Sequence, residues 1–283
     1  MIHIINELMN YLKPPSNCLR IASFDVAKGN FGQWIEDVNI DVVNKLKEKY
    51  DNLPKTKQRR VKGHMNSIIA EILREIYKNG NRISVGVFDF RDDEDSTVLD
   101  IQTRRNLLAH LRSYENLWDT CDIIVIEQQY FNNYAGKKKG KGKGANMNAL
   151  KIAEAVLIWF LDNYPLKEIS SFGSQFKTQI LGAPLGLNDA QRKKWAVEKA
   201  EEIVRLRGDE NMISIYQLKK DIFRKRFNTE EKILIFTKPF DNHPKDIKDL
   251  ANKIVRNKQK LDDFSDAFLQ LLAYIFRVLV ARF

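Results

Sequence analysis

The segment CDIIVIEQQ at residues 121–129, with its continuous apolar run IIVI, limits the possible folds of this chain more than any other segment. Such a run is typical of a strand whose two faces are both covered, as in the middle of a sheet. Residues 18–27, CLRIASFDVA, predict a second buried strand, and helical periodicity follows at 100–117 and 145–164. The sequence therefore predicts an α/β fold in which helices lie on the faces of a mixed sheet.

Other segments complete the predicted order of elements. Alternating apolar and polar residues at 31–38 predict a half-exposed strand that forms a hairpin with residues 18–27. Further strands are expected at 82–91 and within 168–181, which would give five in all. Further helices are expected at 3–12, at 188–207 with Asn188 as its cap, and at 261–283.

The chain is expected to have a short N-terminal extension, residues 1–17, and one domain over residues 18–283. Within this domain, residues 41–80 have the pattern of two helices around a basic connector. Residues 209–257 are also mostly helical in pattern. We interpret both segments as helical insertions.

Charge and cysteine content narrow the class of protein. The 283 residues include 47 Lys and Arg against 37 Asp and Glu, a formal net charge of +10, which favours nucleic acid as a polyanionic partner. Only two cysteines occur, which excludes a disulfide scaffold and a cysteine-based zinc site. No apolar run of about 18 residues is present, and the first residues do not resemble a signal peptide. We therefore expect a soluble, intracellular protein with no membrane partner.

Acidic residues stand at the ends of both buried strands and on the last helix. Asp25 ends the first strand, Glu127 ends the central strand, and Asp263 and Asp266 share one face of the helix, with Asp262 as a possible substitute. Converging carboxylates repel one another, and hard oxygen ligands select Mg²⁺ or Mn²⁺. Two such ions promote phosphodiester hydrolysis by water. A basic protein with these carboxylates is a candidate nuclease.

Each carboxylate also has a purely structural explanation. Asp25 could begin a turn, Glu127 could start a loop, and Asp262 or Asp263 could cap the last helix. The protein would then be a non-enzymatic, basic DNA-binding or packaging protein. The four histidines have no ligand spacing, so none is assigned to a metal.

Three acidic blocks carry a resemblance to a known family. They are SFDVAKGN at 23–30, IVIEQQ at 124–129 and KLDDFSDA at 260–267. In order and placement they resemble the blocks of RuvC-type Holliday junction resolvases, and specifically of the viral branch typified by poxviruses. Glu127 on a strand fits this family; ribonuclease H proper has its glutamate on a helix, and DnaQ-like exonucleases have Asp-x-Glu in the first strand.

The resemblance implies a ribonuclease H-like fold and a homodimer that cuts four-way DNA junctions by paired symmetric nicks, in DNA recombination and repair. It implies that Asp25, Glu127, Asp263 and Asp266 hold two Mg²⁺ ions, which Mn²⁺ can replace, and that the nucleophile is metal-activated water. It also suggests a large DNA virus protein acting in the infected host cell. Another nuclease of the same fold, acting on flaps or RNA–DNA hybrids, is the alternative enzyme.

Several basic residues are candidates for DNA contacts. The lysine–glycine segment 136–144 cannot pack a core. Its lysines Lys137, Lys138 and Lys139 can bind phosphate, and a solvated loop explains them equally well. Arg192 and Lys193 begin a helix, and a solvated helix face explains them equally well. Lys258 and Lys260 directly precede the last acidic block, and Lys177 lies in the strand-like segment FKTQIL. The resemblance assigns phosphate contacts to Lys177 and Lys260.

Overall fold

The computed structural model describes residues 13–27, 29–55, 65–92, 99–129, 147–224, 230–256 and 261–282. They form a five-stranded sheet in the order β3-β2-β1-β4-β5. The strands are β1 (Cys18–Asp25), β2 (Phe31–Asn39), β3 (Asn81–Phe88), β4 (Ile123–Gln128) and β5 (Glu168–Gly173). The first three pair antiparallel, whereas β4 and β5 run parallel to β1. The predicted mixed α/β sheet is confirmed.

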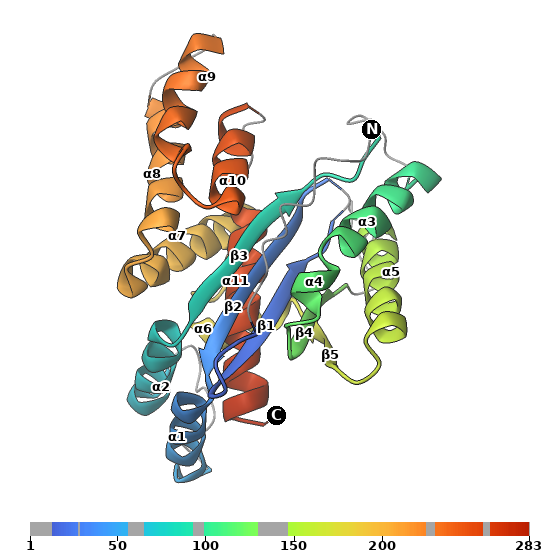
Figure 1. The fold of residues 1–283 in the computed structure, drawn as a ribbon. Coiled ribbons are helices and arrows are strands. Elements are labelled where there is room, and N and C mark those ends of the chain that lie inside the picture. The colour runs from blue at the N-terminus through green and yellow to red at the C-terminus, as the bar shows by residue number, and fades with distance from the viewer. Residues whose placement is uncertain are drawn as a thin grey trace, which may run out of the picture.

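Helices cover both faces of this sheet (Figure 1). One face packs against α11 (Asp262–Tyr274), with α6 (Gln175–Leu181) and α7 (Asp189–Arg207) on the same side. The other face packs against α3 (Ile101–Ser113), α4 (Glu115–Trp118) and α5 (Met147–Asn163). The central strand β4 therefore has apolar contacts on both sides, as its unbroken apolar sequence predicts.

The two segments interpreted as insertions are helical. The first forms α1 (Ile40–Asp51) and α2 (Ser67–Lys78), which pack near the C-terminal end of the chain. The second forms α8 (Glu210–Arg224), α9 (Glu230–Thr237), the 3-10 helix η1 (Lys238–Phe240) and α10 (Lys245–Arg256). None of the helices in the described ranges is long and apolar enough to cross a membrane.

The prediction that β2 is half-exposed is wrong. Its residues from Phe31 to Val38 are all buried, including the polar side chains of Gln33, Glu36 and Asp37. Glu36 is neutralised by Arg207 of α7, with 2.6 Å between Oε2 and Nη1. Asp37 is paired with Arg20 of β1. The alternation of apolar and polar residues predicted solvent exposure, but Glu36 and Asp37 face buried cationic partners instead.

Two further predictions about elements need correction. Residues 168–181 do not form one strand, because β5 ends at Gly173 and α6 begins at Gln175. The C-terminal segment is helical as expected, but α11 ends at Tyr274 and continues as a π-helical turn, η2 (Ile275–Val280). The apolar residues of α11 are buried within its own domain, so they provide no free surface for a second chain.

Some predictions concern residues outside the described ranges. These are the helix at 3–12, the lysine–glycine segment at 136–144 and the two lysines before the last acidic block, Lys258 and Lys260. The helix at 188–207 is confirmed as α7. Its Asn188 cap is also confirmed, since the Asn188 side chain accepts a hydrogen bond from the Gln191 amide and the Gln191 side chain reciprocates.

Candidate active site

Two neighbouring parallel strands bring the first two acidic residues together. The register pairs Ser23 with Val125 and Phe24 with Ile126, so Asp25, the last residue of β1, lies level with Glu127, the second-to-last residue of β4. Alternate residues of a strand point to the same face. Asp25 and Glu127 therefore share the face of the sheet on which α11 lies.

Helices α11 and α6 add an aspartate and a lysine to this edge. The Lys177 ammonium lies 2.9 Å from Asp266 Oδ1 and 3.3 Å from Glu127 Oε1. Lys177 and Glu127 are 9% and 6% exposed, so this is a buried ion-pair cluster. The Gln129 amide donates a further hydrogen bond to Glu127 Oε2 at 2.5 Å. Lys177 was predicted on a strand, but it reaches the site from α6.

The cluster shifts the pKa values of Asp25, Asp266 and Lys177. Burial raises the pKa of Asp25 well above its usual range, and the charges of Glu127 and Asp266 raise it further, against the lowering effect of Lys177. Burial also raises the pKa of Asp266, although Lys177 opposes this. Burial alone would lower the pKa of Lys177, but the surrounding carboxylates outweigh it and raise that pKa. When ionised, these three carboxylates exceed the one ammonium by two negative charges.

The other two aspartates of α11 lie in its first turn. Asp262 is buried and pairs with Lys193 of α7, with 2.5 Å between Oδ2 and Nζ. Asp263 is also buried, and its backbone carbonyl lies against Gly32 of β2. Asp25, Glu127 and Asp266 thus form the assembled cluster with Lys177. Asp263 lies one turn before Asp266. It lies beside Gly32, the β2 residue that pairs with Asp25.

Sequence reasoning missed two residues that shape the site. Gly32 pairs with Asp25 in the β1–β2 register, and a Cβ atom there would overlap the Asp263 carbonyl. Only glycine therefore allows the first turn of α11 to approach the sheet this closely. Gln270 is 1% exposed and donates hydrogen bonds to β1 and β4. The available signal for Gln270 was a polar residue that interrupts the apolar residues of α11 after Asp266.

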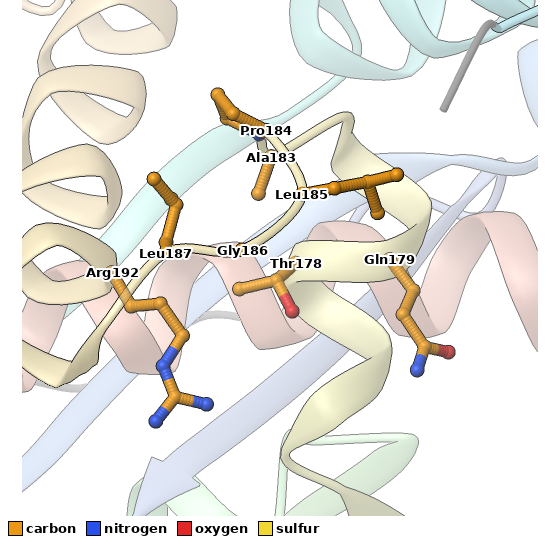
Figure 2. A pocket seen from close by; sticks show the side chains of 8 residues that line it. All are labelled: Thr178, Gln179, Ala183, Pro184, Leu185, Gly186, Leu187 and Arg192. Carbon is orange, nitrogen blue, oxygen red and sulfur yellow. The ribbon is translucent and has the colours of Figure 1, made fainter. Parts of the chain in front are cut away.

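The predicted DNA-contacting residues have different positions. Lys193 is engaged with Asp262 at the site, whereas Arg192 is exposed and pairs with Asp189. Arg192 also lines a shallow hollow of about 180 Å³ between α6 and α7 (Figure 2). The rest of the hollow is lined by Thr178, Gln179, Ala183, Pro184, Leu185, Gly186 and Leu187. The predicted contacts Lys137, Lys138, Lys139, Lys258 and Lys260 lie outside the described residues.

The cluster has the donor chemistry of a site for hard divalent cations. Within the described ranges, no group of three or more histidine, cysteine, aspartate or glutamate side chains is already arranged to hold a metal ion. The Lys177 ammonium instead lies between Glu127 and Asp266. Carboxylate oxygens with excess negative charge are the ligands that Mg²⁺ and Mn²⁺ prefer. Asp25, Glu127 and Asp266 therefore have the oxygen donors that such an ion prefers, although in the described residues they do not form a metal-binding group.

Comparison with known proteins gives one viral relative. The chain is 25% identical over 191 residues to uncharacterized protein 97L of invertebrate iridescent virus 3, covering 65% of this chain and 85% of that protein. This similarity is consistent with a viral origin. No protein-family profile matches the chain, and no solved structure matches it.

Proposed function

We propose that this protein is a metal-dependent, structure-selective DNA endonuclease of ribonuclease H-like fold that resolves four-way junctions. The observation that carries the proposal is the convergence of Asp25, Glu127 and Asp266 at one edge of the sheet. A structural role explains each carboxylate singly. It does not explain why three of them share a buried site at a cost in desolvation and repulsion.

The topology supports the ribonuclease H-like assignment. An antiparallel β1–β2–β3 unit is followed by β4 and β5, which are parallel to β1. Glu127 lies on β4, the strand next to β1. This placement favours the resolvase arrangement over that of ribonuclease H proper, in which the glutamate lies on a helix.

The residues of the cluster have distinct proposed roles. When bound, Mg²⁺ would activate the attacking water and stabilise the leaving oxygen of the phosphodiester. Asp25, Glu127 and Asp266 would supply the ligands, with Asp263 beside them. Lys177 balances part of their charge in the metal-free protein. With metal present it would be released to hydrogen-bond a phosphate oxygen, and Lys193 at the same edge would bind the DNA backbone.

A panel of DNA substrates tests this proposal. We expect Mg²⁺-dependent nicking of a synthetic four-way junction to exceed nicking of a flap, an RNA–DNA hybrid and a linear duplex. Equal or faster cleavage of flap or hybrid would identify a different nuclease of the same fold. Binding of all substrates with no cleavage at any Mg²⁺ or Mn²⁺ concentration would favour a non-enzymatic DNA-binding protein.

A second copy of the chain is the expected protein partner, because two symmetric cuts need two active sites. The outer face of α5 has the properties of a self-complementary surface. Its apolar residues Met147, Ile158 and Leu161 are 43%, 61% and 51% exposed, and the exposed Lys151 and Glu154 lie between them. An antiparallel twofold pairing centred between Lys151 and Glu154 brings opposite charges together and places Met147 against Ile158.

Dimerisation through α5 can be tested by placing a charge on this face. The wild-type chain is expected to sediment at about twice 33.0 kDa at micromolar concentration. Ile158→Glu should shift it to monomer, because each half of the isologous contact would bury an unpaired carboxylate against Met147. The matched control is Leu234→Glu on α9, which is 66% exposed and should leave the dimer intact. A wild-type monomer that binds junctions with one chain per DNA would contradict paired cutting.

A further inference from the structure

Gln270 connects the three elements that carry the carboxylates. It lies on α11, one helical turn after Asp266, and its side chain is 1% exposed. Its Nε2 donates to Ser23 Oγ and to the Phe24 carbonyl oxygen, each at 3.2 Å, on β1. The same atom lies 3.5 Å from the Val125 carbonyl oxygen on β4. A single amide thus links α11 to both strands.

Packing alone gives no reason for a glutamine at this position. The neighbouring α11 residues Phe268, Leu269, Leu271 and Leu272 are all fully buried and apolar. The Oε1 atom of Gln270 is buried and has no hydrogen-bond partner among the described residues. Burying this amide is unfavourable unless its hydrogen bonds contribute something that an apolar side chain cannot.

The contribution we infer is geometric. Apolar contacts between a helix and a sheet are non-directional, so they permit small rotations and shifts of α11. Hydrogen bonds from one amide to two strands are directional and limit such shifts. Phe24 directly precedes Asp25, and Val125 precedes Glu127 by two residues. The carbonyl groups that Gln270 contacts therefore belong to the backbone that positions both carboxylates.

We propose that Gln270 is a positioning residue that sets the separation of Asp266 from Asp25 and Glu127. This inference rests on the proposed function, because the separation matters only if the three carboxylates share a metal ion. Removing a residue that orients the metal ligands without touching the metal typically lowers metal affinity or activity about 10- to 100-fold. Gln270 touches neither DNA nor metal in this proposal and acts through the strands and helix that it joins.

The test measures Mn²⁺ binding to the full-length, DNA-free protein by electron paramagnetic resonance. Gln270→Met keeps a side chain of similar length and removes the hydrogen bonds. We expect Mn²⁺ affinity to fall about 10- to 100-fold. Junction affinity should be unchanged, and kcat should fall while KM for the junction stays constant. Gln217→Met is the matched control, because Gln217 is exposed on α8, and it should retain wild-type Mn²⁺ affinity.

The outcomes separate this inference from the proposed function. A wild-type protein that binds no Mn²⁺ and cuts no junction overturns both. A wild-type protein that does both, together with a Gln270→Met variant of unchanged Mn²⁺ affinity and kcat, overturns the role of Gln270 alone. If Gln270→Met does not fold, Ser23→Ala removes one acceptor and leaves the glutamine in place. It should weaken Mn²⁺ binding measurably, and unchanged binding would overturn the inference.

Discussion

Asp25→Asn is expected to abolish junction cleavage while leaving junction binding intact. The substitution preserves size but removes the charge needed at the metal. The rate should fall at least about 100-fold, beyond the effect typical of residues outside the first ligand shell. Glu127→Gln should have the same effect, whereas Asp162→Asn, at an exposed position on α5, should cleave normally. Near-normal cleavage by Asp25→Asn would show that the metal-site assignment is wrong.

The same variant should make the metal-free protein more stable. Folding raises the pKa of Asp25 from its usual value near 3.8, because burial and the neighbouring carboxylates disfavour its charged form. The folded state therefore holds this proton more tightly than the unfolded state. That contribution to stability is complete at low pH and is lost as pH rises through the raised folded-state pKa. In EDTA, the stability advantage of Asp25→Asn should grow with pH above about 4.

Arg207→Met is expected to cause a large loss of fold stability, because it removes the cation of a buried ion pair. Glu36 of β2 is 0% exposed, and Arg207 lies 2.6 Å from it while stacking on the Phe268 ring at 4.9 Å. Removing the cation leaves a buried, unpaired carboxylate, which costs about 3–5 kcal/mol. Urea unfolding, which measures the free energy of unfolding, should show this loss.

Two further variants make that result specific. Arg205→Met removes an exposed pair with Glu201 on the same helix, and it should cost less than about 1 kcal/mol. Adding Glu36→Gln to Arg207→Met should recover part of the loss, because the remaining buried group is then neutral. Equal destabilisation by Arg207→Met and Arg205→Met would contradict the burial of Glu36.

The sequence was sufficient to predict the mixed sheet and to place Asp25 and Glu127 at the ends of two of its strands. Mostly apolar segments identify β1 and β4, and the acidic residues at their ends lie close together because the strands are parallel neighbours. The buried ion pairs were not predictable, since Glu36 and Arg207 are 171 positions apart and each resembles a solvated surface residue in its local sequence. The alternation of apolar and polar residues in β2 therefore predicted that Glu36 is exposed to solvent. In the structure, Arg207 of α7 contacts it instead.

The wrong secondary structure predicted for Lys177 arose because the segment is short. Phe176, Ile180 and Leu181 are too few to distinguish a helix from a strand by periodicity, so Lys177 was predicted on the wrong element. Its approach to Glu127 and Asp266 depends on α6 and α11 meeting in three dimensions. Gly32 and Gln270 act through contacts with distant segments, so their local sequence does not reveal their role.

The most direct test of the central claim is mapping the nicks in a labelled four-way junction with Mg²⁺ and with EDTA. The proposed mechanism predicts two nicks at symmetric positions on opposing strands, present with Mg²⁺ or Mn²⁺ and absent with EDTA. Cleavage should be lost in Asp25→Asn and Glu127→Gln. Nicks that persist in EDTA, or that persist in both variants, would contradict a metal-dependent nuclease site formed by Asp25, Glu127 and Asp266.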